Sequence, residues 1–183
     1  MQGCPLRCLY CHNPDIAFFN DEKKLMTPEQ VLNKIVRYKS YFGEEGGVTF
    51  SGGEPLKQPK FLLETLKLCK ANGINTALDT SGVGEDFEEL LNFVDTVILD
   101  IKAVEAEDYK KLTGLEIDKF NKFLNCVQKK KIDLWLRQVI VPGINDTEEN
   151  ILSLKKYISK LRNVKKVELL PYHDMAKSKY KKL

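Results

Sequence analysis

The stretch TVILDIK, residues 96–102, places two charged residues directly after a short apolar run. The run at 96–99 has the length and composition of a strand in a parallel sheet. Asp100 and Lys102 follow it, at the edge of the sheet where the working residues of α/β proteins gather. The stretch therefore predicts an α/β fold with a functional site at the carboxyl ends of its strands.

The same alternation of strand and helix recurs along the chain. Further apolar strands are predicted at 48–50, 76–78, 134–141 and 167–170, and amphipathic helices begin near residues 27, 59, 87, 120 and 146. Thr27 and Gln30 predict a capping box at the start of the first helix, and Asp146 predicts the start of the last. Five complete strands favour an open or partial barrel over a closed eightfold one.

Polar residues stand at the end of, or within, every predicted strand. These residues are Ser51, Gly52, Gly53, Glu54, Asp79, Thr80, Asp100, Lys102, Arg137, Gln138 and His173. Because the carboxyl ends of parallel strands meet at one edge, we expect these groups to share a single site.

The composition excludes several classes of protein. The 183 residues are 43% hydrophobic, with a net charge of +3, and fit one domain with a sizeable core. We expect no nucleic-acid partner, because basic and aromatic residues are not clustered together. We also expect no membrane association, because no apolar run approaches the roughly 20 residues needed to cross a bilayer. The odd number of cysteines, five, and their crowding favour a reducing cytoplasm.

Three of these cysteines lie close together in CPLRCLYCHNP, residues 4–14. Cys4, Cys8 and Cys11 could hold zinc or an iron–sulfur cluster. A structural zinc site needs a fourth ligand, and His12 is poorly placed because it adjoins Cys11. Three cysteines on a four-iron cluster would leave one iron open to another molecule, so the spacing favours the cluster without excluding zinc. The other two cysteines stand on or beside apolar helical stripes and are expected to be core residues.

The cysteine spacing, with the aromatic Tyr10 before the third cysteine, resembles the signature of the radical S-adenosylmethionine (SAM) enzymes. The longer string QGCPLRCLYCHNPD is similar to the activating enzymes of pyruvate formate-lyase. The likeness continues in the same order through GGVTFSGGEPL, TALDTSG, VILDIK, WLRQVIVPG and VELLPYH, and so covers nearly the whole chain.

The resemblance implies an open, partial TIM-like (β/α)6 barrel whose first strand is missing or incomplete. It implies a single radical SAM core domain over residues 1–183. Within it we expect a cluster loop at 1–15, a partial β/α barrel at 27–173 and a short basic C-terminal tail at 174–183. Members of the family begin with a further strand and continue past His173, so we expect this chain to be a fragment, or to have a misplaced start, and to be poorly stable.

The resemblance also assigns roles to residues. Cys4, Cys8 and Cys11 would bind a [4Fe-4S] cluster and, with Lys102, form the catalytic set. The residues expected to bind SAM are Tyr10, His12, Gly52, Gly53, Glu54, Asp79, Asp100, Lys102 and His173. Glu54 would pair with the amine of SAM, and Tyr10 and His12 would contact its adenine side. A monovalent cation near Asp79, Thr80 and Asp100 is a further expectation, and Arg137 either meets the substrate or braces the rim.

The activity implied is reductive cleavage of SAM, followed by abstraction of the α-hydrogen of a glycine in pyruvate formate-lyase. The expected electron donor is a flavodoxin or ferredoxin, and the protein is expected to be a monomer. The first helix follows Cys11 closely with no inserted cysteines, which favours the formate-lyase type. Activation of another glycyl radical enzyme, such as anaerobic ribonucleotide reductase, and an inactive iron–sulfur protein are the alternatives.

Overall fold

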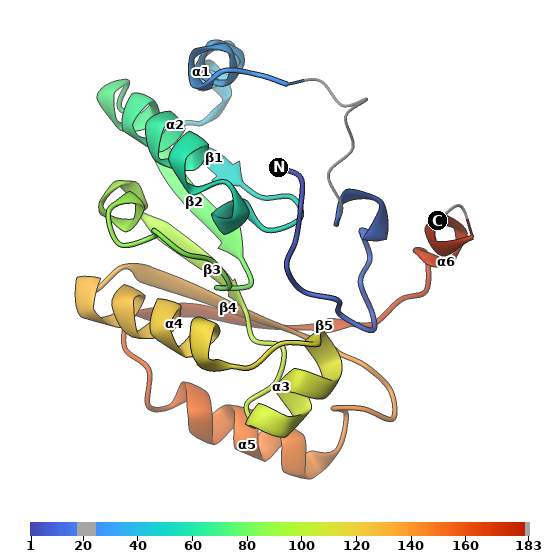
Figure 1. Cartoon of the computed structure of the whole chain (residues 1–183). Coiled ribbons are helices and arrows are strands. Elements are labelled where there is room, and N and C mark those ends of the chain that lie inside the picture. Colours follow the sequence, from blue (N-terminus) through green and yellow to red (C-terminus); the bar gives the residue numbers. More distant parts are fainter. Residues whose placement is uncertain (18–24, 182–183) are drawn as a thin grey trace.

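All five strands of the described chain run parallel in one sheet (Figure 1). The computed structural model describes residues 1–17 and 25–181. The strands are β1 (Gly47–Phe50), β2 (Asn75–Thr80), β3 (Thr96–Asp100), β4 (Asp133–Ile140) and β5 (Val164–Pro171), and they pair in that order. Within the described residues β1 and β5 do not pair with each other, so the barrel is open. The predicted fold class is confirmed.

α-Helices lie in three of the four connections between the described strands, and a 3-10 helix lies in the connection from β2 to β3. The α-helices are α1 (Pro28–Val36), α2 (Pro59–Ala71), α3 (Ala106–Thr113), α4 (Asp118–Lys130), α5 (Glu148–Ile158) and α6 (Lys177–Tyr180). Short 3-10 helices occur at Pro14–Ile16, Lys39–Tyr41, Pro55–Lys57 and Leu90–Phe93. Within 1–17 and 25–181, no helix combines the length and apolar character that crossing a bilayer would demand.

The predicted helix starts are right at α1 and shifted at α5. Thr27 and Gln30 form the expected capping box, with Gln30 N donating to Thr27 Oγ1 at 3.3 Å and Thr27 N to Gln30 Oε1 at 3.0 Å. At α5 the N-cap is Thr147 rather than Asp146. Asp146 accepts a hydrogen bond from Gly143 N at 2.9 Å instead, and so stabilises the preceding turn.

The helix predicted near residue 87 is wrong. The chain there forms only a 3-10 helix at Leu90–Phe93. Asp86 has a φ of 53°, a left-handed conformation that an α-helix cannot include, and Asp95 already pairs with the start of β2. These two residues bound the segment on either side, and Phe87, Leu90 and Leu91 are buried as the apolar pattern implies.

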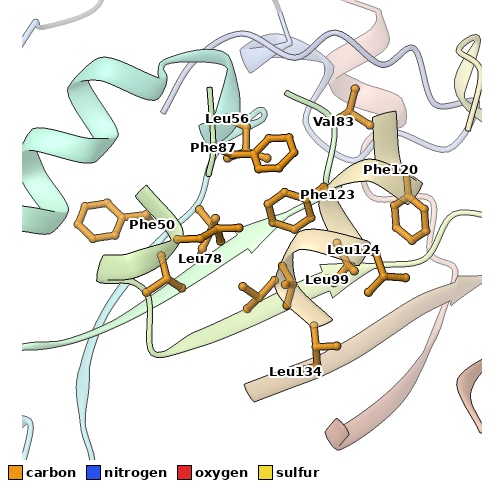
Figure 2. Packing of buried hydrophobic residues seen from close by; sticks show 14 of the residues in the cluster. Phe50, Leu56, Leu78, Val83, Phe87, Leu99, Phe120, Phe123, Leu124 and Leu134 are labelled. Carbon is orange, nitrogen blue, oxygen red and sulfur yellow. The ribbon is translucent and has the colours of Figure 1, made fainter. Parts of the chain in front are cut away.

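The main core lies between the sheet and the helices that cover one of its faces (Figure 2). Phe50, Leu78 and Leu99 come from neighbouring strands and are nearly or fully buried. Phe87 packs edge-to-face on Phe123 of α4, with ring centroids 5.1 Å apart. Side chains alternate along a strand, so the residues between these core positions point to the opposite face. Asp79 and Asp100 lie on that opposite face, which leaves them free to build a site.

Asp95 ties the start of β2 to helix α2. Thr76 N and Thr76 Oγ1 donate to Asp95 Oδ2 at 2.8 and 3.2 Å, and the Lys70 ammonium contacts Oδ1. Burial alone would raise the pKa of Asp95, but Lys70 and Thr76 outweigh it and lower the pKa below its usual value. Because the folded-state pKa is depressed, the contribution to stability is present above the unfolded-state pKa and is lost as the pH falls through the folded-state pKa.

Asp95→Asn is therefore expected to lower the free energy of unfolding at pH 7 by about 1 kcal/mol, a value discounted because Asp95 is partly exposed. The difference from the wild type should shrink as the pH is lowered below about 4. Urea unfolding at several pH values measures this. A difference that stays constant from pH 7 to pH 3 would contradict the role given to the carboxylate.

Candidate functional site

A hollow of about 220 Å³ opens at the carboxyl ends of the strands. It is lined by the three cysteines of the cluster loop and by residues that lie in or directly after four strands. The lining includes Cys4, Cys8, Tyr10, Cys11, His12, Ser51, Gly52, Gly53, Asp79, Thr80, Asp100, Lys102 and Arg137. Of the residues predicted to share the site, Glu54, Gln138 and His173 do not line this hollow.

The cluster loop is held in place by hydrogen bonds between backbone groups. Gly3 N and Cys4 N donate to Ile16 O and Ala17 O, both at 2.9 Å. Arg7 N and Leu9 N, on either side of Cys8, donate to Thr113 O at 2.8 Å and Leu112 O at 3.0 Å. The last carbonyls of a helix have no partner within the helix, so the end of α3 provides ready acceptors for the loop.

Four charged side chains, two positive and two negative, lie together at the rim, so that their charges balance. The Arg137 guanidinium bridges two carboxylates: Nη2 contacts Asp79 Oδ1, and Nε donates to Asp100 Oδ1 at 3.3 Å. Lys102 Nζ donates to Asp100 Oδ2 at 3.1 Å. Burial raises the pKa of Asp79, and the Arg137 charge opposes this rise. Burial tends to lower the pKa of Lys102, but the Asp100 carboxylate outweighs it and raises that pKa, so Lys102 stays charged.

Glu54 is placed differently from the expectation based on its motif. Its side chain is fully buried. Oε1 accepts from Leu56 N at 3.0 Å and Thr80 Oγ1 at 2.5 Å, while Oε2 accepts from Ser81 N at 2.8 Å and from Ser81 Oγ. Four donors within the protein thus occupy the carboxylate, which links the segment after β1 to the end of β2. Contact with the amine of SAM stays a prediction for this residue.

The glycines before Glu54 allow two backbone segments to approach closely. A Cβ on Gly52, which has a φ of 145°, would lie 2.1 Å from Met1 O, and one on Gly53 would lie 2.4 Å from Gly3 O. Gly53 N donates to Met1 O at 2.9 Å, and Glu54 N donates to Gly3 O at 2.8 Å. The glycines therefore let residues 1–3 run against residues 51–54 beside the hollow.

The C-terminal segment reaches the cluster loop from the other side. The rings of His12 and His173 stack with centroids 4.0 Å apart, and His12 Nε2 lies 3.0 Å from His173 O. Tyr180 of α6 donates its hydroxyl to Cys11 O at 2.9 Å. The sequence analysis did not identify Tyr180, because it lies beyond the last motif and no pattern of residues marks it.

Comparison with known proteins identifies the family. A sequence model described as the radical SAM superfamily matches residues 1–154. The chain belongs to the radical SAM superfamily. It is 51% identical to the pyruvate formate-lyase-activating enzyme of Clostridium pasteurianum, over an alignment covering 100% of this chain and 77% of that protein. The chain is therefore a member of the pyruvate formate-lyase-activating enzyme family within this radical SAM superfamily.

Solved structures agree with this assignment. A crystal structure of a domain of the pyruvate-formate lyase-activating enzyme from Bacteroides vulgatus is 30% identical with a TM-score of 0.62, and the match covers 70% of this chain and 81% of that chain. SuiB from Streptococcus suis, solved with bound S-adenosylmethionine, has a TM-score of 0.71 at 16% identity, covering 95% of this chain and 38% of that chain. The second likeness shows the shared fold alone.

The three cysteines fit the [4Fe-4S] cluster that radical SAM membership implies. Burial raises the pKa of Cys4 to about 11 and also raises the pKa of Cys8. Within the described ranges, no three His, Cys, Asp or Glu side chains are grouped as the ligands of one ion would be. In a cluster each cysteine binds a different iron, so thiols spread around a hollow suit a cluster better than a single zinc.

The remaining cysteines have no place in this radical SAM site. Cys69 is fully buried on α2, and Cys126 lies half-buried against the core on α4. The prediction of a core residue is confirmed for Cys69, whereas Cys126 packs at the edge of the core.

Proposed function

We propose that this radical SAM chain activates pyruvate formate-lyase by abstracting the α-hydrogen of a glycine in that enzyme. Cys4, Cys8 and Cys11 would hold a [4Fe-4S] cluster, with SAM in the same hollow. When bound and reduced, the cluster supplies the electron that cleaves SAM into methionine and a 5′-deoxyadenosyl radical. The observation that carries the proposal is that three thiols and four compensated rim charges line one hollow at the carboxyl ends of the strands.

The residues of the hollow would bind and orient SAM and keep water out. Lys102 is largely buried and stays charged, so it provides a fixed positive charge opposite the carboxylates of the site. Gly52 and Gly53 line the hollow, and their backbone would contact the methionine end of SAM. His12, stacked on His173, forms an aromatic wall suited to the adenine ring. Tyr10 lines the same side of the hollow.

Several expectations about the surroundings of the enzyme belong to this proposal. The electron would come from a flavodoxin or ferredoxin, and the protein would act as a monomer, one core domain, in the cytoplasm. All five cysteines are free, as a reducing compartment would keep them.

The test begins with anaerobic reconstitution of the cluster, followed by reduction with dithionite and measurement of SAM cleavage. Pyruvate formate-lyase is then added, and the glycyl radical is sought by electron paramagnetic resonance (EPR). The proposal expects both 5′-deoxyadenosine and a glycyl radical. Cleavage without a radical on pyruvate formate-lyase, but with one on anaerobic ribonucleotide reductase, would reassign the substrate. No deoxyadenosine from a protein with an intact cluster would overturn the catalytic claim.

A monovalent cation at Asp79, Thr80 and Asp100 is part of the proposal, and Arg137 gives a way to test it. The guanidinium already lies between the two carboxylates and offsets their charge. Arg137→Met would leave those carboxylates facing each other without it. Lys102 would then be the remaining positive side chain of the group, and it pairs with Asp100 alone. We expect the loss of Na⁺ or K⁺ to raise the Kd of SAM about tenfold more in this variant than in the wild type, because the cation would then offset Asp79.

The measurement is the Kd of SAM in potassium chloride and in tetramethylammonium chloride, whose cation is too large for the site. Arg162→Met is the matched control, because Arg162 is exposed and does not line the hollow. Equal cation dependence in the wild type and in Arg137→Met would contradict a cation site between these carboxylates.

A further inference from the structure

Two tyrosine hydroxyls near the cluster loop lack a hydrogen-bond partner within the described chain. Tyr10 and Tyr109 are nearly and fully buried, and no protein group receives or donates a hydrogen bond at either oxygen. A buried, unpaired hydroxyl costs about 1–3 kcal/mol of stability. Tyr10 lines the hollow, but Tyr109 is not among its lining residues, so the cost at Tyr109 calls for an explanation.

Tyr109 belongs to the helix that supports Cys8. It lies on α3, three and four residues before Leu112 and Thr113. The carbonyls of those two residues accept the amides of Leu9 and Arg7, which flank Cys8 on both sides. The backbone around Cys8 is thus fixed to the last turn of the helix that carries Tyr109.

The pKa of the hydroxyl responds to charge on the same cysteine, in keeping with the docking of the loop on α3. Burial raises the pKa of Tyr109, and Cys8 is the charged neighbour that contributes most to the further rise. Lys102 acts in the opposite direction and is also close. The phenol therefore stays protonated at any ordinary pH and remains a hydrogen-bond donor.

The aromatic ring of Tyr109 makes the packing contacts of this side chain, and its hydroxyl makes no hydrogen bond within the described chain. The ring lies against Phe120 of α4, with centroids 5.9 Å apart. A phenylalanine would fill the same space without burying an unpaired oxygen. The unpaired hydroxyl is explained if its acceptor becomes a good one only when the cluster is bound. The sulfur of Cys8 fits, because a thiol accepts hydrogen bonds weakly and a metal-bound thiolate accepts them well.

We propose that Tyr109 is a further cofactor-contacting residue, whose hydroxyl donates a hydrogen bond to the sulfur of Cys8 once that sulfur binds an iron of the cluster. The proposal rests on the cluster assigned under the proposed function. It does not depend on SAM cleavage or on pyruvate formate-lyase. Hydrogen bonds to cluster sulfurs stabilise the more negative, reduced state and so raise the reduction potential.

Tyr109→Phe removes the hydroxyl and keeps the ring. In the cofactor-free protein the variant is expected to be as stable as the wild type or more stable, because an unpaired group has been removed. In the reconstituted protein, the ratio of reduced to oxidised cluster at a fixed solution potential should fall by about three- to tenfold, where tenfold corresponds to 59 mV for one electron. Redox titration monitored by EPR measures this ratio.

A second measurement detects the hydrogen bond itself. Electron–nuclear double resonance of the reduced cluster in D₂O should show an exchangeable deuteron in the wild type that is missing in Tyr109→Phe. Tyr157→Phe is the matched control: Tyr157 is half-buried on α5, and only burial, with no cysteine contribution, shifts its pKa. The control should change neither the potential nor the deuteron signal.

The outcomes separate the alternatives. An unchanged potential and deuteron signal in Tyr109→Phe would overturn the proposal. A loss of cofactor-free stability with an unchanged potential would also overturn it, and would show that the hydroxyl has a structural partner such as a buried water. If the wild type assembles no cluster, the proposed function fails at its first step. A cluster that forms but does not cleave SAM still permits both measurements on Tyr109.

Discussion

Glu54→Ala is expected to lower the free energy of unfolding of the cofactor-free protein by about 3 kcal/mol or more. The substitution removes a fully buried carboxylate and leaves without an acceptor the four donors contributed by Leu56, Thr80 and Ser81. Urea unfolding without cluster or SAM measures it. Glu89→Ala is the control, because Glu89 is exposed and pairs with Lys67 at the surface, and its cost should be below about 1 kcal/mol.

The result decides between two roles for this glutamate. If its main partner were the amine of SAM, Glu54→Ala would weaken SAM binding and leave the cofactor-free protein as stable as before. A double-mutant cycle with Ser81→Ala sharpens the comparison, because the two side chains are in direct contact. We expect a coupling of about 1–3 kcal/mol in the unfolding of the cofactor-free protein. Additive effects would show that the carboxylate does not link the two segments.

Cys8→Ala is expected to abolish cluster assembly and to reduce SAM cleavage by more than about a hundredfold. Changes to groups that merely support a metal ligand already cost about 10–100-fold, so losing a ligand should cost more. The loop itself should survive, because the amides beside Cys8 are held by carbonyls of α3 and not by the thiol. Iron and sulfide content, the EPR spectrum and deoxyadenosine yield provide the measurements.

Cys126→Ala is the matched control for this experiment. Cys126 lies on α4 and away from the hollow, so the variant should assemble the cluster and cleave SAM like the wild type. Undiminished SAM cleavage by Cys8→Ala would contradict the ligand assignment. Equal losses in both variants would point to general damage by cysteine replacement.

The sequence predicts those site residues whose location follows from their position at the end of a strand. Asp79, Asp100 and Lys102 could be placed at one rim because parallel strands bring their carboxyl ends together, whatever surrounds them. The direction of a side chain after a turn is not encoded in the same way. The sequence identifies Glu54 as an acidic residue near the site, but only the folded chain shows its carboxylate accepting bonds from Thr80 and Ser81.

For helix α3, too, the sequence contains the signals for the helix itself but not for what packs against it. The sequence analysis did not single it out, although Gly114, with a φ of 77°, ends it in the usual way and basic residues fill its last turn. Those signals were available. The contact between the end of α3 and the residues that flank Cys8 could not be predicted, because it depends on how the cluster loop docks against the helix. Near Phe87 the prediction failed in the other direction: the apolar pattern correctly marked the buried residues, but the segment does not form the α-helix predicted from it.

The docking of the cluster loop on α3 bears on the order in which the holoenzyme is assembled. Two amides around Cys8 take their acceptors from a helix that needs no metal to form. The loop can therefore adopt its shape during folding, and iron and sulfide can bind afterwards to a site that is already formed.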